Sequence, residues 1–353
     1  MALVFMDGFD YLPVQFQTTP SAPLSSMWTN GNKWTGYSSS GGYLGTSSAT
    51  TPYSFGLSLY SYISSIHRTL GANYTTLFAG FNFYCTGFGN TPQILAFYDG
   101  GNGQVALVVT SSGYLTALSY AGGATICASS SALSTNTWYY VEFSSAFSSS
   151  GAVQIRVNGS TVASGTGNTG SSGNSYANVV YMGTAIYSAP PPVEAYFDDF
   201  ILMDSTGTSL NGFQGPLRIY SVLPNSDVSN TGWTLSSGST INSLINETAT
   251  TTTNYVESSI SSSEYLVGCA GLYGGAGAVQ AVAVNVVAQA SASTPASFTN
   301  TLKSGSTTVN SATFTPVVTT PGIFQSIYTT DPNTSAAWST SAVNSIQVGA
   351  TIS

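Results

Sequence analysis

Apolar and polar residues alternate with a period of two along most of this chain, and clusters of Gly, Ser, Thr, Asn and Pro interrupt the alternation. Such a pattern is typical of short β-strands joined by turns. No stretch carries an apolar stripe with helical spacing. The pattern therefore predicts an all-β protein. In its first half, strands are expected at residues 2–9, 53–60, 77–85, 94–98, 105–109 and 114–120.

An aromatic strand at 138–143 is followed by two apolar runs, 152–157 and 160–163, which Asn158 and Gly159 connect. Asn-Gly between alternating runs predicts a two-residue hairpin, because both central residues of a type I′ turn have positive φ. We therefore expect Gly159→Val to cost stability and to shift the hairpin register.

The stretch 196–225 looks like the last strand of one β-domain running into the first strand of another. A strand at 196–203 ends in turn residues at 204–207, Asn211-Gly212 breaks the chain again, and the alternation resumes at 217–223. The boundary is thus expected near 205–215, with domains at 1–212 and 213–353. Further strands are predicted at 233–236, 255–258, 265–272, 279–288, 297–302, 313–318, 323–328 and 345–351.

Both faces of the predicted strand 279–288 are largely apolar, as expected of a central strand in a sheet. Eight or nine short strands after the boundary indicate a second β-sandwich, jelly-roll-like in type.

Charged residues make up 5% of the 353 residues, with 13 acids against 5 bases and a net charge of −8. A phosphate-binding groove needs several Lys and Arg residues, so the composition argues against nucleic acid as a partner. Solubility must come from hydroxyl and amide groups. Together with 42% hydrophobic residues, this composition favours a rigid surface protein over a cytosolic enzyme.

Cys85, Cys127 and Cys269 are far apart and odd in number, so they are expected as three small buried hydrophobic residues; a Cys85–Cys127 bridge is the alternative. The first residues lack the basic and apolar regions of a signal peptide. Segment 276–290 is apolar but too short to span a bilayer. We expect a protein made in the cytoplasm, without membrane insertion, that assembles into a particle.

No catalytic constellation stands out, and a non-enzymatic protein is expected. Glycan-cleaving jelly rolls need paired carboxylates on one strand face, whereas Asp198 and Asp199, with Glu194 nearby, should point to opposite faces. A structural role is expected, with one of these two aspartates capping backbone amides and the other exposed. His67 is the single histidine, and the sequence contains no G-x-S-x-G nucleophile elbow with which it could form a catalytic triad. It is therefore expected to form hydrogen bonds or to lie at the surface. The glycines of 271–277 carry no phosphate-loop lysine.

Aromatic residues in the irregular region between the early strands could stack on sugars. They are Trp28, Trp34, Tyr37 and Tyr43. Packing between strands or subunits is the alternative, since the chain has 22 tyrosines. Glycan is therefore a candidate partner.

The aromatic strand 138–143 (WYYVEF) and the segment 153–162 (VQIRVNGSTV) resemble the laminin-G/concanavalin A-like jelly rolls over residues 1–205. This resemblance implies two curved sheets in which the first and last strands pair, which would place 2–9 beside Asp198 and Asp199. It also implies a calcium site as an alternative to ordinary turn capping. The local oxygen ligands for calcium would be Asp7, Asp10, Asp198, Asp199 and Asp204.

Ordered segments over nearly the full length resemble a family of bacteriophage virion proteins. They are VFMDGFD, FDDFILMDSTG, NGFQGPLRI, LPNSD, GWTLSSGS, VQAVAVN and YTTDPNTSAAWSTSAVNSIQVG. The resemblance implies a structural component of the virion, tail-associated or capsid-decorating, that contacts other virion proteins and copies of itself. The alternative is a lectin-like protein that recognises a host surface glycan.

Overall fold

The computed structural model describes residues 2–10, 29–48, 51–52, 58–89, 91–185, 194–247, 253–272, 277–291, 296–318 and 320–353. The chain divides into two compact units. The first extends from Trp34 to Ile219 and includes residues 2–10; the second extends from Tyr220 to Ser353 and includes residues 29–33. The boundary between the two units lies after Ile219, whereas the sequence pattern predicted a domain boundary after residue 212. Both units are built from strands, so the predicted all-β class with jelly-roll-like sandwiches is confirmed.

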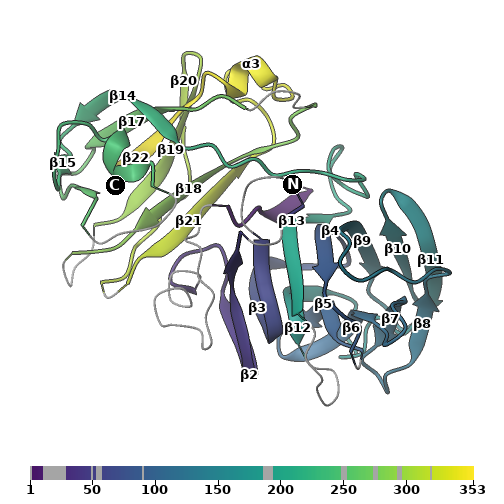
Figure 1. The fold of residues 1–353 in the computed structure, drawn as a ribbon. Coiled ribbons are helices and arrows are strands. Elements are labelled where there is room, and N and C mark those ends of the chain that lie inside the picture. The colour runs from purple at the N-terminus through teal and green to yellow at the C-terminus, as the bar shows by residue number, and fades with distance from the viewer. Residues whose placement is uncertain are drawn as a thin grey trace. The chain divides into compact units, whose positions relative to one another are not determined.

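A single 13-stranded sheet forms the first unit, in the order β11-β10-β9-β4-β13-β3-β12-β5-β6-β7-β8, with β1 on β13 and β2 on β3 (Figure 1). The strands are β1 (Leu3–Asp7), β2 (Gly36–Ser47), β3 (Ser58–Tyr74), β4 (Thr76–Cys85), β5 (Gln93–Asp99), β6 (Asn102–Val109), β7 (Leu115–Ser119), β8 (Thr125–Ala128), β9 (Tyr139–Ala146), β10 (Gly151–Val157), β11 (Ser160–Gly167), β12 (Ala177–Ala185) and β13 (Glu194–Asp204).

The two ends of this long sheet order, β8 and β11, lie against each other (Figure 1). Glycine makes the close approach possible, since a Cβ at Gly165 would lie 2.6 Å from the carbonyl oxygen of Ile126. Because its ends meet, the sheet curves back on itself and encloses a core between two layers.

Phenylalanine fills that core. The ring of Phe97 on β5 stacks on Phe143 of β9 at 5.7 Å and meets Phe147 edge-on at 5.7 Å. Since neighbouring residues of a strand face opposite ways, Ala96 and Tyr98 are on the other face of β5. The core thus fixes which side chains the outer face of this layer presents.

Two local predictions are confirmed. Val157 pairs with Ser160 across a turn in which Asn158 and Gly159 have φ of 49° and 82°. The first strand β1 pairs antiparallel with β13, with Asp7 opposite Phe200. These contacts follow from the Asn-Gly turn and from the resemblance to jelly rolls, respectively.

A five-stranded sheet, β14-β17-β22-β19-β20, and two two-stranded sheets, β15-β16 and β18-β21, form the second unit. Its elements are β14 (Pro224–Thr231), β15 (Thr234–Leu235), α2 (Asn242–Ile245), β16 (Val256–Glu257), β17 (Glu264–Cys269), β18 (Val282–Ala288), β19 (Phe298–Ser304), β20 (Thr307–Asn310), β21 (Gly322–Tyr328), α3 (Thr340–Val343) and β22 (Gln347–Ile352). Buried Asn300 on β19 donates hydrogen bonds to the backbone oxygens of Val284 and Phe324, which links the sheets.

Three strand predictions for the second unit need correction. Residues 217–223 form no strand, and the unit's first strand is β14. Within 313–318, Phe314 forms only an isolated bridge to Phe298. The expected central strand 279–288 is β18 in a two-stranded sheet; it buries Val282 and Val284 and leaves Val287 39% exposed. The valines of this segment therefore indicate a preference for strand structure, but they do not show that both faces of the strand are buried.

The described part of the chain contains no helix long and apolar enough to cross a bilayer. Residues 53–57 of the expected strand 53–60, as well as Trp28, lie outside the described residues.

Candidate functional site

The acids of the first unit are mainly internal. Asp7 accepts hydrogen bonds from the backbone N–H of Phe9 at 2.9 Å and from the indole N–H of Trp34 at 2.7 Å. Trp34 is fully buried and packs at 4.8 Å from Phe5. Trp34 is thus a core residue, and the hypothesis that it stacks on a sugar is wrong.

Asp198 and Asp199 are 4% and 1% exposed, so the expectation that one of them is exposed is wrong. Asp199 has a φ of +51° at an irregularity in the pairing of β13 with β4, which interrupts the strict alternation assumed for this strand. Its carboxylate accepts hydrogen bonds from the side-chain amide of Asn82 at 2.7 Å and from the backbone N–H of Ile219 at 2.6 Å. Capping of backbone amides is therefore observed.

Burial raises the pKa of Asp198, and the neighbouring carboxylates, Asp199 first and then Asp10 and Asp7, raise it further. A carboxyl group in these surroundings is protonated at neutral pH. Among the described residues, no group of three or more His, Cys, Asp or Glu side chains is arranged to hold a metal ion. The geometry therefore gives the calcium alternative no support, and Asp204 caps the backbone N–H of Thr206.

The cysteines are all unpaired. Cys85 is buried, whereas Cys127 and Cys269 are only partly buried. Burial raises the pKa of the three thiols, to about 12 for Cys85 and about 11 for the other two. These thiols are protonated at neutral pH, which makes them weak nucleophiles and weak metal ligands.

His67 lies on the outer face of β3, next to an open depression of about 330 Å³. Gly36 on β2 is opposite His67, and a Cβ at Gly36 would lie 2.3 Å from the imidazole, so glycine makes room for the ring. Tyr181 on β12 is the partner on the other side, where the two rings stack with their centroids 4.8 Å apart and their planes at 27°.

The imidazole of His67 forms no hydrogen bond through its buried Nδ1. Burial lowers the pKa of His67, so the ring is neutral at pH 7 and offers a lone pair. Burial and the nearby Tyr98 raise the pKa of Tyr181, which keeps its hydroxyl protonated. The two rings stack rather than exchange a proton, and no carboxylate or serine is bonded to His67 within the described residues.

Three half-buried tyrosines continue from this point across the outer face of β12, β5 and β6–β7; we call Tyr98, Tyr120 and Tyr181 the tyrosine row. Tyr98 lies 4.5 Å from Tyr181, and its hydroxyl is 2.6 Å from that of Tyr120. The hydroxyl of Tyr120 donates to the side-chain oxygen of Gln93. The rings cover four small or aliphatic residues, Ala96, Ala106, Val108 and Leu118.

The depression has an uncharged lining. Its residues are His67, Thr69, Leu70, Gly71, Ala72, Asn73, Gly100, Asn178, Val179 and Tyr181. Asn178 is fixed at the rim, because its carboxamide oxygen accepts from the N–H of Gly100 at 2.7 Å and its amide donates to Asn73 at 3.0 Å. Arg68 follows His67 on β3, and its guanidinium lies over the ring of Phe5, at 4.4 Å from the ring centroid.

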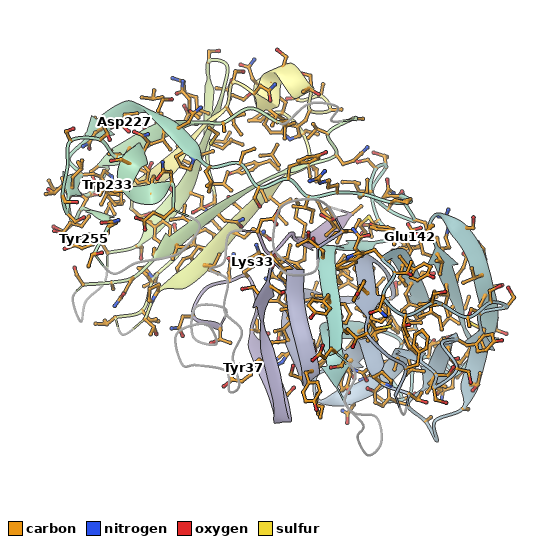
Figure 2. The ribbon with its side chains drawn as sticks, in the orientation of Figure 1. Lys33, Tyr37, Glu142, Asp227, Trp233 and Tyr255 are labelled. Atoms are coloured by element: carbon orange, nitrogen blue, oxygen red, sulfur yellow. The ribbon has the colours of Figure 1, made fainter. Side chains whose placement is uncertain are left out.

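Sequence reasoning singled out His67 but missed the residues around it. The alternation in 94–98 already places Ala96 and Tyr98 opposite Phe97, a signal that could have identified one end of the tyrosine row. The approach of Asn73, Gly100 and Asn178 depends on the pairing of three strands distant in sequence. Tyr37, on β2, is 39% exposed (Figure 2), and Tyr43 belongs to the same strand.

No family model and no curated protein matches the chain. Among solved structures, it is similar to the cellulose-induced protein Cip1, with a TM-score of 0.38 and 16% identity over 48% of this chain and 90% of that one. It is also similar to the alginate lyase Aly36B, with a TM-score of 0.36 and 12% identity over 57% and 96% of the two chains. The binding domain of botulinum neurotoxin serotype C1 gives a TM-score of 0.33 and 12% identity over 46% and 42%.

Proposed function

We propose that this chain is a non-enzymatic structural component of a bacteriophage virion, tail-associated or capsid-decorating, which acts through interfaces with other virion proteins and with copies of itself. The observation that carries the proposal is the uneven distribution of exposed apolar side chains. Six of the eight large hydrophobic residues that are exposed in the described part of the chain belong to the shorter second unit. They are Val228, Tyr255, Ile260, Val287, Val317 and Val318.

Ile260 is the most exposed of these residues, at 61%. Tyr255, at 43%, lies in the same part of the second unit as the half-buried Trp233 (Figure 2). Trp233 stacks edge-on against Tyr265 at 4.9 Å, so a firm core holds this surface in place. Exposed apolar residues on a rigid support are the usual anchors of protein interfaces.

Burial of charges supports the same proposal. Six of the 13 acids are buried, together with Lys33, so the exterior carries still fewer charges than the composition suggests. The six are Asp7, Glu142, Asp198, Asp199, Asp204 and Asp331. Surfaces of hydroxyls, amides and rings enter a permanent interface without the desolvation cost of buried ions. The symmetry of a particle would then repeat each contact.

The test is to purify intact particles of the phage that encodes this chain and to locate the chain on them with a labelled antibody in the electron microscope. We expect regular labelling of the tail or the capsid, at the same sites on each particle. A chain that stays in the lysate while the particles carry no label would contradict the proposal.

The second candidate function is recognition of a host surface glycan by the first unit. The specific observation that favours it is the open, uncharged depression beside His67 and Tyr181, which continues into the tyrosine row. Under this candidate, label confined to the distal tail or fibres is expected, whereas a purely structural component could lie anywhere along the particle.

A further inference from the structure

We infer that the depression beside His67 binds an uncharged saccharide, with the tyrosine row as the track along which further sugar rings extend. The inference specifies the ligand class and the site of the second candidate function, on which it rests. It differs from the sequence-based hypothesis, which placed sugar contacts at Trp28, Trp34, Tyr37 and Tyr43.

Size and openness suit one end of an oligosaccharide. The depression of about 330 Å³ is at the lower end of the range of about 300–1,000 Å³ for small-molecule sites. Glycines create part of the space, because a Cβ at Gly71 or at Gly100 would meet no atom within 4 Å. A ligand therefore has room between the end of β3 and the turn that joins β5 to β6.

Polar groups around the depression match the hydroxyls of a sugar. The neutral imidazole of His67 carries one donor and one acceptor nitrogen, and the phenol of Tyr181 and the carboxamide of Asn73 each supply both kinds of group. Asn178 is already held by Gly100 and Asn73, so the rim is ordered before a ligand arrives. Preordered polar groups reduce the entropy lost on binding.

Rings beside these groups match the apolar C–H faces of a sugar. Tyr181 is stacked on His67 on one side and tilted by 44° against Tyr98 on the other, and Tyr98 meets Tyr120 edge-on, so a partly buried aromatic surface continues to Tyr120. Rings that are locked by their neighbours lose little conformational freedom when a ligand covers them. The combination of aromatic faces with single hydrogen-bonding groups is the chemistry that saccharides need.

Charge decides between neutral and acidic sugars. Among the described residues, no lysine, arginine, aspartate or glutamate lines the depression, and the guanidinium of Arg68 lies over Phe5 near Asp7 instead. A carboxylate-bearing sugar would lose its hydration without gaining a partner of opposite charge. The site should therefore favour glycans built from neutral hexoses over uronates and sialosides.

The inference is tested by titrating the full-length chain with neutral oligosaccharides (maltohexaose, cellohexaose and mannohexaose) and with two acidic ones, oligogalacturonate and sialyllactose, in a calorimeter. We expect at least one neutral ligand to bind. Gly71→Leu should weaken that binding by about tenfold or more, because the added side chain fills the depression without strain in the fold. Tyr181→Ala should weaken it to a similar degree by removing the stacking surface.

Gly87→Leu is the matched control, since a Cβ at Gly87 also meets no atom within 4 Å and Gly87 does not line the depression. The affinity of this variant for the neutral oligosaccharide should stay within about twofold of that of the unmodified chain. Absence of binding by every neutral ligand, tighter binding of an acidic ligand, or binding that Gly71→Leu leaves unchanged would each overturn the inference. The assay uses the free chain, so it can succeed or fail independently of the labelling of particles.

Discussion

The two units of this chain differ in how many of their large apolar side chains are exposed to solvent. The first encloses large rings such as Phe97 and Phe143 completely, and among its described large hydrophobic residues only Tyr37 and Tyr114 are more than a third exposed. The second has core clusters around Phe298 and Leu302, and six such residues in its described part are exposed. A unit whose large apolar side chains are buried in its own core has an outer face that is free to bind a small ligand. Exposed large apolar side chains, by contrast, are typical of a surface that binds another protein.

Removal of a core ring should produce the largest effect and separate the two units most clearly. Phe97→Ala deletes a ring that contacts Phe143 and Phe147, so we expect the free energy of unfolding of the first unit to fall by about 3–5 kcal/mol. Urea unfolding followed by circular dichroism should show one transition shifted and the transition of the second unit unchanged. A common shift of a single transition would contradict separate cores. Tyr114→Ala, which alters an exposed side chain of the same unit, is the control and should change stability by less than about 0.5 kcal/mol.

Gly159→Val tests whether the hairpin in the first unit depends on its turn. The glycine has a φ of 82°, and a Cβ there would meet only Pro216 at 3.6 Å, so strain in the backbone rather than crowding sets the cost. We expect a loss of about 2 kcal/mol in the free energy of unfolding. Unchanged thermal unfolding would show that the turn tolerates a β-branched residue. Gly212→Val, at a glycine without positive φ or close neighbours, should have little effect.

Asp198→Asn tests whether the interior of the first unit holds a neutral carboxyl group. Burial raises the pKa of Asp198, so the folded state favours the protonated form, and its contribution to stability is lost as the pH rises above about 4 toward the folded pKa. An asparagine mimics the protonated form at every pH. We therefore expect the variant to be more stable than the unmodified chain by a few kcal/mol at pH 8, and by less at pH 5.

Thermal unfolding at the two pH values, with and without calcium, provides the measurement for Asp198→Asn. A variant that is less stable than the unmodified chain at pH 8, with the loss confined to calcium-containing buffer, would show that Asp198 is ionised and holds the cation. That result would revive calcium as a ligand of Asp198 and its neighbours.

Ile260→Asp should have the smallest effect on stability and the clearest effect on association. Ile260 is 61% exposed, so a charge there should change the free energy of unfolding by less than about 0.5 kcal/mol. In an interface, however, the carboxylate would be desolvated without a partner. Sedimentation velocity should show weaker self-association than for the unmodified chain. Ser259→Asp places the same charge one residue away and is the matched control.

Local patterns in the sequence predicted local structure well. Asn158-Gly159 predicted the hairpin between β10 and β11, and the alternating runs at 77–85 and 94–98 predicted β4 and β5. Patterns failed where burial depends on the partners of a strand, as at 279–288, where the valines of β18 are part of a two-stranded sheet. The same limit applies to the site: His67 and Tyr181 are far apart in sequence, and only the pairing of β3 with β12 brings them together.

The division between the units is tested most directly by epitope accessibility on intact particles. One antibody fragment would be selected on the free chain against the surface formed by residues 255–260, which we call the Tyr255–Ile260 surface, and another against the His67 depression. Both would then be applied to virions under the electron microscope. We predict that the fragment against the depression labels the particle, whereas the fragment against the Tyr255–Ile260 surface does not, because neighbouring proteins cover it. Labelling of the Tyr255–Ile260 surface with the depression masked would contradict the account.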